Sequence, residues 1–327
     1  MLTLRPASIE WMPFRQSLLN DPRTMAYNAR WTPPDGCIAF PEMEWDAWLE
    51  VQKSNFPECG CFYLVNDDGT PVGEASWHGY GVGMGIVIHA GYRGKGYGRE
   101  GLRLLVDEAF RHKEITELMN SFEESRHAAL AIHKQEGFVV LRQEKGMMHL
   151  RLTRERYTAL RRRELLSKLM DAMCAFDAGD ALRIHHFVKV HNFARQIGIA
   201  EGMDDHALFV LEAAAITHDI GIHPSEAKYG DCIGKHQEEL GPIEAEPMLR
   251  SLGFEENVIQ RVCFLIGHHH TTVNVDGLGW QILLEADFLV NMVEGNMSAH
   301  AVDTAEEKLF RTEEGKRLLR YIIPAQS

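Results

Sequence analysis

The chain has 327 residues, enough for two domains, and its 45% hydrophobic and 25% charged residues are typical of globular proteins. The formal net charge of −13 argues against a nucleic-acid polymer as a partner, because an acidic chain repels a phosphate backbone. No apolar run approaches the ~18 residues that cross a bilayer, and residues 1–5 contain no apolar signal core. The six scattered cysteines form no CxxC pair, so we expect reduced thiols in a cytoplasmic protein without a membrane partner.

The first 152 residues alternate short apolar runs with turn signals, which predicts an α/β domain. The expected strands are residues 61–65, 71–75, 85–88 and 147–152. A helix is expected from about Gly98, because the apolar residues that follow it recur at helical spacing.

A glycine-rich loop, Arg93-Gly-Lys-Gly-Tyr-Gly98, lies between the strand at 85–88 and this helix. Glycines let a backbone approach a ligand closely, and the free amides at a helix N-terminus attract an anion. The loop therefore predicts a phosphate cradle. Its spacing is neither the GxGxxG of dinucleotide folds nor the GK[ST] ending of a nucleotide-triphosphate loop.

The loop resembles the [RQ]-x-x-G-x-[GA] signature of the GNAT N-acetyltransferases, with Arg93, Gly96 and Gly98 at its three defined positions. Residues 126–138 look like the second signature of that family. The resemblance implies a mixed sheet with flanking helices over residues 1–152, with acetyl-CoA as co-substrate and an amine as acceptor. The cofactor-binding residues that it implies are Ile88, Arg93, Gly94, Lys95, Gly96, Tyr97 and Gly98.

Two positions depart from this family's pattern. His127 stands where an Asn is usual, and His133 where the family has a Tyr that often protonates the departing thiolate. An imidazolium is a competent acid, so His133 is the predicted catalytic acid, although the same substitution also fits weak or lost transfer. No base is assigned, and Glu74 and His89 stay open for that role.

Residues 153–171 are charged and contain neither Gly nor Pro, which predicts a helical connector. The remaining residues, 172–327, show helical patterns punctuated by Gly and Pro, so this part is predicted to be all-α. The expected helices are residues 180–198, 204–218, 241–252, 255–268 and 280–294.

Four side chains within these helical patterns predict a metal site: His186, His218, Asp219 and Asp287. Histidine is the commonest metal ligand in proteins. The two aspartates fall in strongly apolar segments, where a carboxylate costs several kcal/mol unless it is paired or bound to a cation. Two histidines and two aspartates suit a divalent Mn, Fe, Co, Ni or Mg ion.

The same four residues resemble the H…HD…D pattern of the HD superfamily of metal-dependent phosphohydrolases. This resemblance implies an HD-like helical domain over residues 172–327 that hydrolyses a nucleotide or another small-molecule phosphate ester. Asp219 is the catalytic metal ligand that it implies, and Lys189 occupies a basic position that would neutralise the phosphate.

Further histidines extend the prediction to a second metal or a phosphate contact through His236, His268 and His269, with Asp219 as a bridge. The run His268–His270 is also compatible with a polar pocket rim that binds substrate phosphate. The HD subgroup that cleaves cyclic dinucleotides has a Lys where this chain has Ile222, and its Gly-Tyr-Pro motif is missing here, so that activity is disfavoured.

Three hypotheses for the whole protein follow. The leading one is a fusion of an acetyltransferase and a phosphohydrolase. In the second, only the hydrolase is catalytic and the first domain binds acetyl-CoA as a regulator. In the third, the metal site is structural and the protein is not an enzyme. The substrates, the metal and the oligomeric state stay open.

Overall fold

The computed structural model describes residues 1–323, with Ala299 described by its backbone alone. The chain divides into two compact units, Met1–Leu160 and Arg161–Ser327. Within the described residues, no helix combines the length and the apolar character needed to cross a membrane.

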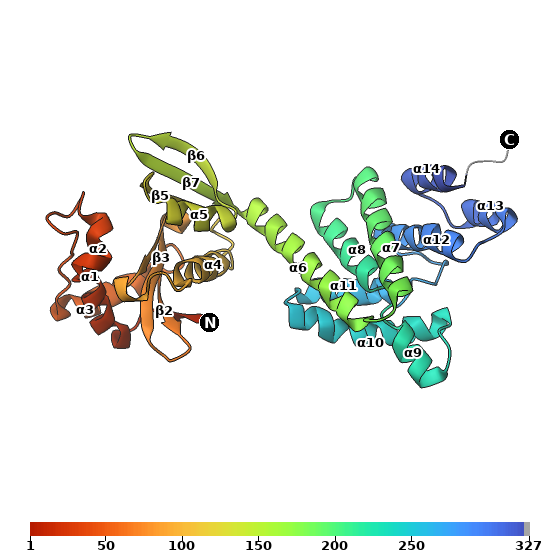
Figure 1. The fold of residues 1–327 in the computed structure, drawn as a ribbon, viewed down its shortest axis with the longest axis horizontal. Helices are drawn as coiled ribbons and strands as arrows, with labels where there is room; N and C mark the ends of the chain where they lie inside the picture. Colours follow the sequence, from red (N-terminus) through yellow and green to blue (C-terminus); the bar gives the residue numbers. More distant parts are fainter. Residues whose placement is uncertain (324–327) are drawn as a thin grey trace. The chain divides into compact units, whose positions relative to one another are not determined.

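The first unit contains two antiparallel sheets and several helices, so the predicted α/β architecture is confirmed (Figure 1). The first sheet has the order β1 (Leu2–Pro6), β2 (Gly60–Asn66), β3 (Pro71–His78) and β4 (Gly83–Ile88). The second has the order β5 (Glu117–Glu123), β7 (Met147–Thr153) and β6 (Val139–Glu144). The helices of this unit are α1 (Met12–Leu19), α2 (Pro22–Met25), α3 (Trp45–Ser54), α4 (Tyr97–Ala109) and α5 (His127–Gln135).

Close packing of α4 on the first sheet fixes the glycine-rich loop that precedes this helix. Leu102, Leu105 and Val106 are fully buried in the core that α4 shares with β2 and β3. Gly101 permits this approach, because a Cβ atom there would lie 2.6 Å from Cδ1 of Leu64. The N-terminus of α4 is thereby held beside the end of β4.

The second unit is helical, as predicted. Helix α6 (Arg154–Phe176) begins before the boundary between the units and is followed by eight further helices in the described residues. These are α7 (Ala181–Ala200), α8 (Asp205–Thr217), α9 (Ile222–Tyr229), α10 (Gly234–Leu252), α11 (Glu256–Ile266), α12 (Gly277–Glu294), α13 (Ala299–Lys308) and α14 (Glu313–Ile322). The predicted start of the helix at residue 241 is wrong, because α10 begins at Gly234 and continues through Pro242.

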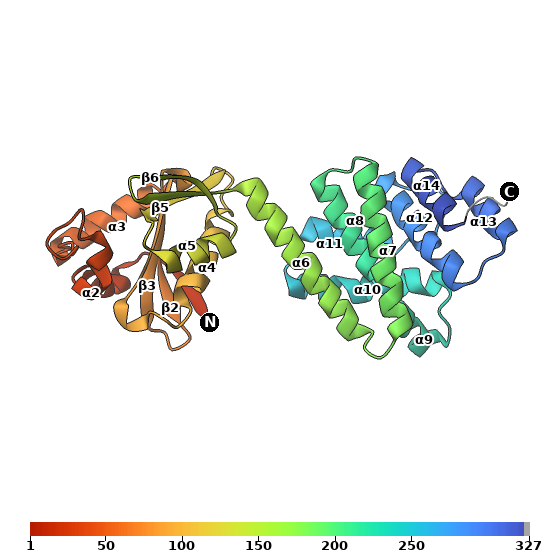
Figure 2. The same cartoon turned by 45° about the horizontal axis from the view of Figure 1, so that its top comes forward.

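Helices α7, α8 and α12 pack against one another in the core of this unit, and Figure 2 shows them side by side. Their apolar residues include Phe187, Leu211 and Leu283, each at most 1% exposed. The same three helices, or the residues directly after them, carry the four predicted metal ligands. A polar group placed on their inner faces is therefore removed from water.

Candidate functional site

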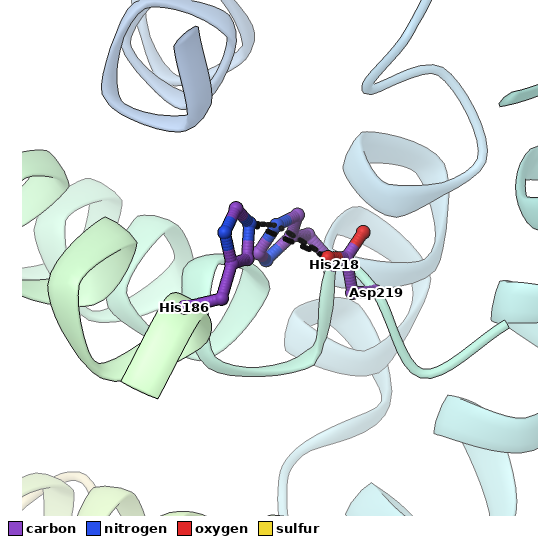
Figure 3. Close-up of side chains that lie close together, drawn as sticks. All are labelled: His186, His218 and Asp219. Atoms are coloured by element: carbon purple, nitrogen blue, oxygen red, sulfur yellow. Dashed lines mark hydrogen bonds and ion pairs between the residues drawn. The ribbon is translucent and has the colours of Figure 1, made fainter. Parts of the chain in front are cut away.

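His186, His218, Asp219 and Asp287 converge in the helical unit. His186 lies on α7 and Asp287 on α12, while His218 and Asp219 follow the last residue of α8. The Nε2 atom of His186 lies 3.2 Å from Nε2 of His218 and 3.1 Å from Oδ1 of Asp287. Oδ2 of Asp219 lies 3.4 Å from each of these two Nε2 atoms. Figure 3 shows the side chains of His186, His218 and Asp219 pointing toward one another.

The hydrogen bonds behind the histidine rings set which nitrogen faces the group. Nδ1–H of His218 donates to the carbonyl of Ala215 at 3.0 Å, and Nδ1 of His186 lies 2.9 Å from a carboxylate oxygen of Glu294. Nε2 is therefore the nitrogen that each ring directs toward the group, and the two Nε2 atoms lie 3.2 Å apart.

The two carboxylates are ionised in this setting. Burial raises the pKa of Asp219, but His218 and His269 outweigh this effect and lower the pKa to about 2. Burial likewise raises the pKa of Asp287, but His186 and His218 bring it below its ordinary value. His186 responds in the opposite direction: burial lowers its pKa, whereas Asp287 and Asp219 raise it to about 9. The group therefore has the electrostatics of a cation site.

Another buried carboxylate, that of Glu285 on α12, provides a comparison. Glu285 is 0% exposed, and it accepts hydrogen bonds from the amides of Arg311 and Thr312 and from the side chain of Gln281. Backbone amides and a side-chain amide thus satisfy Glu285, whereas Asp287 faces two histidine nitrogens and accepts one hydrogen bond from Asn291.

These distances fit a single metal ion. Bonds of about 2.0–2.2 Å place neighbouring donors of one tetrahedral or octahedral ion roughly 2.8–3.6 Å apart. The Nε2 atoms of His186 and His218 lie 3.1 to 3.5 Å from the other donor atoms of the set. His186, His218, Asp219 and Asp287 would hold the ion.

Asp219 also joins a second group, with His269 and His270. Nε2 of His269 is buried without a hydrogen-bond partner and lies 3.5 Å from Oδ1 of Asp219. Burial lowers the pKa of His270 to about 4, which leaves this ring neutral and able to act as a ligand.

The other two predicted members of the second group, His236 and His268, have different contacts in this structure. His236 bonds to Asp231 at 2.7 Å and stacks on Tyr229. Nδ1–H of His268 donates to the carbonyl of Phe264, and its ring packs against Trp280. Local aromatic packing thus holds these two histidines in contacts of their own, and His270 takes their place beside His269.

Lys189, predicted to neutralise a substrate phosphate, is paired in this structure. Its ammonium nitrogen lies 2.8 Å from Glu294, whose other carboxylate oxygen contacts His186. The lysine is therefore tied to the metal group through one carboxylate.

The first unit contains a cavity of about 570 Å³ that is lined by residues of β4, β5, α4 and α5. These strands lie side by side but belong to separate sheets, and no ladder joins them in the described residues. Five of the predicted residues line the cavity. Its lining also includes Tyr27, Asn120, Arg99 and Arg126, which the sequence analysis did not identify. The five are Ile88, Arg93, Gly96, Gly98 and His133. The predicted residues Gly94 and Lys95 lie in the adjoining loop and Tyr97 begins α4, and the cavity lining does not include them.

The loop has the backbone shape of an anion cradle. Gly94 and Gly96 have φ angles of +79° and +86°, and Gly96 is the N-cap of α4. The first amides of the helix have no intrahelical partner, so they are available to a phosphate group. Arg93 contributes to the shape of the loop: its guanidinium donates to the carbonyls of Ile88 and Thr24, at 3.1 and 2.8 Å.

Comparison with known families identifies this part of the chain, because residues 1–139 match the family model described as the acetyltransferase (GNAT) domain. The N-terminal unit contains a GNAT acetyltransferase domain. The match ends before the helical unit, and no curated protein matches the chain.

Solved structures that resemble the chain include a spermidine N-acetyltransferase from Vibrio cholerae in complex with CoA and spermine, with 17% identity and a TM-score of 0.39. The similarity covers 48% of this chain and 98% of that one. An aminoglycoside acetyltransferase in complex with coenzyme A and kanamycin has 19% identity and a TM-score of 0.39, over 49% of this chain and 99% of that one.

The role of His133 as an imidazolium acid of the GNAT domain stays a prediction, and its surroundings favour the neutral ring. His133 is 1% exposed, its Nδ1–H donates to the carbonyl of Ala129 at 2.7 Å, and its Nε2 accepts from Asn120 at 2.9 Å. Burial lowers its pKa to about 4, so the ring is neutral at pH 7 and both nitrogens are engaged.

Neither residue left open as a base lines the cavity of the GNAT domain. Glu74 forms an ion pair with Arg15, and each side chain is only 13% exposed. Nδ1 of His89 accepts a hydrogen bond from the amide of Gly91. Neither residue is therefore placed in this cavity to act as a base.

The buried, neutral His133 makes the stability of the GNAT domain depend on pH. The folded state keeps the ring neutral down to about pH 4, whereas the unfolded chain takes up a proton below about pH 6.5. Stability therefore falls as the pH drops through this window. We expect His133→Gln to remove about 2 kcal/mol of the loss between pH 7 and pH 5.

Urea unfolding followed by tryptophan fluorescence measures this difference, because five of the six tryptophans precede residue 80. Equal losses in the wild type and in His133→Gln between the two pH values would show that His133 is not held neutral.

Proposed function

We propose that the chain is a fusion of an acetyl-CoA-dependent N-acetyltransferase and an HD-type metal-dependent phosphohydrolase. The observation that carries the hydrolase is the convergence of His186, His218, Asp219 and Asp287 from separate helices at donor distances suited to one ion. The observation that supports acetyl-CoA binding is the cradle before α4 beside a cavity within a GNAT domain.

In the hydrolase, the four residues would bind a divalent ion, which supplies a Lewis acid for phosphate oxygens and lowers the pKa of a bound water. Asp219 lies between the two groups of potential ligands and would belong to both if His269 and His270 held a second ion. A cavity of about 360 Å³, lined by His269, His270 and Asp287, offers room for a phosphate ester beside these ligands.

In the acetyltransferase, the amides of the cradle would bind the pyrophosphate of acetyl-CoA, and Arg99 and Arg126 add positive charge to the cavity wall. The acetyl group would lie toward Asn120 and His133. Because His133 is neutral, proton transfer to the departing thiolate would need another donor or water.

A second candidate function has a specific observation in its favour. His133 is hydrogen-bonded at both nitrogens, and neither Glu74 nor His89 reaches the cavity, which fits a GNAT domain that binds acetyl-CoA without transferring its acetyl group. Multiple-turnover acetylation of any amine by the purified protein would exclude this candidate.

The hydrolase proposal predicts that Asp219→Ala abolishes metal binding and phosphate-ester hydrolysis while coenzyme A binding is retained. The variant removes the only residue shared by both ligand groups. Elemental analysis of protein purified without chelator, and titration with Mn²⁺, measure the loss. Asp303→Ala, an exposed carboxylate on α13, is the matched control and should bind metal like the wild type.

A wild-type protein that takes up no Mn²⁺, Ni²⁺ or Mg²⁺ would refute the hydrolase proposal. Metal binding without hydrolysis of any of a broad set of phosphate esters would favour the structural site instead. Loss of coenzyme A binding in Asp219→Ala would show that the two activities are not independent.

The cradle proposal predicts that Gly96→Ala weakens coenzyme A binding about tenfold, because an alanine at positive φ costs roughly 1–2 kcal/mol and distorts the amides that face the pyrophosphate. Gly69→Ala is the matched control: Gly69 has a φ of +76°, and at both glycines a Cβ would meet nothing within 4 Å. Calorimetric titration with coenzyme A should separate the two variants. Equal affinities would contradict a cradle at Gly96.

A further inference from the structure

Three polar side chains lie on one face of α12 and point toward the metal group. Asp287, Asn291 and Glu294 are four and three residues apart, the spacing that aligns side chains along a helix. Nδ2 of Asn291 donates to Oδ1 of Asp287 at 2.8 Å. Oε2 of Glu294 lies 2.9 Å from Nδ1 of His186 on the neighbouring helix α7. Helix α12 thus offers one ligand and two residues that contact ligands.

The contact with Glu294 distinguishes His186 from the other two histidines. His218 and His269 direct Nδ1 to carbonyls of their own chain segment, those of Ala215 and Ile266. His186 is the one of the three whose ring is held by a side chain from another helix. A carboxylate behind a metal-binding imidazole fixes the ring tautomer and raises the basicity of the other nitrogen.

The position of Glu294 is unfavourable for α12 itself. It is the last residue of the helix, where the negative end of the helix dipole disfavours an acid. The carboxylate is stabilised there by Lys189, at 2.8 Å from Oε1, and by His186. A residue that breaks a local rule and is compensated by tertiary contacts often serves the functional site.

We propose that Glu294 is a positioning residue of the metal site: it accepts the Nδ1–H of His186 so that Nε2 faces the cation, and Lys189 holds Glu294 in this place. The inference rests on the proposed metal site. It also gives Lys189 a role through Glu294, in place of a direct contact with substrate phosphate.

The test measures metal affinity and coordination in the full-length protein. Removing a residue of this kind typically costs about 10–100-fold in metal affinity, so Glu294→Ala should weaken Mn²⁺ binding by that factor. Glu294→Gln, which keeps an acceptor but loses the charge, should restore part of the affinity. Lys189→Met should weaken binding less than Glu294→Ala, because the contact between Glu294 and His186 remains.

Two further measurements distinguish a positioning role of Glu294 from an effect on folding. The visible spectrum of the Co²⁺-loaded protein should change in Glu294→Ala, because the orientation of His186 is altered. The thermal unfolding of the metal-free protein should stay close to that of Glu307→Gln, an exposed glutamate on α13 that serves as the matched control.

The outcomes are distinguishable. If the wild type binds Mn²⁺ and Co²⁺, and Glu294→Ala binds them with the same affinity and spectrum, the inference is wrong and the metal site stands. If the wild type binds neither ion, the proposed metal site fails and the inference fails with it. An equal loss of affinity in Glu307→Gln would also overturn the inference, because the effect would then be general.

Discussion

Two ionised carboxylates held inside a helical core are the constraint on which the second unit depends. Asp219 and Asp287 lie among helices whose other inner residues are apolar, and each carboxylate faces histidine nitrogens. Buried charges of this kind need positive charge close by. Glu285, two residues before Asp287 on α12, shows how the same core satisfies a buried carboxylate through amide and side-chain donors.

Hydrogen bonds from backbone groups and from neighbouring side chains hold the ligands of this group in place. Backbone carbonyls orient His218 and His269, whereas side chains of α12 contact Asp287 and His186. Packing of α7 against α12 is therefore also the packing that sets the relative position of the ligands. A shift between these helices would alter the donor separations directly.

In the GNAT domain, cofactor binding and acid–base chemistry depend on different structural features. The shape of the cradle follows from local backbone conformation, with positive φ angles at Gly94 and Gly96 and a helix that starts at the next residue. Acid–base chemistry depends instead on which side chains reach the cavity. There the structure offers a neutral His133 and leaves Glu74 in an ion pair with Arg15. The structure thus supplies more of the groups expected for acetyl-CoA binding than of those expected for proton transfer.

Much of the fold could be predicted from the sequence, because helical spacing, strand alternation and turn residues act over a few neighbouring positions. The strands β2, β3, β4 and β7 of the first unit and the all-helical character of the second were predicted in this way, whereas β1, β5 and β6 were not. The start of helix α10 was predicted too late, because the helix begins at Gly234 and continues through Pro242 and Pro247.

The sequence by itself determined the glycine loop and the set of His186, His218, Asp219 and Asp287, because the residue types and their apolar settings already exclude most other chemistry. Only the tertiary structure decided which further groups join them. His270 rather than His268 lies with Asp219, and Glu294 stands behind His186 from a helix more than a hundred residues away in the chain. The physical reason is that ring orientation and contacts between helices depend on packing, which local sequence patterns do not specify.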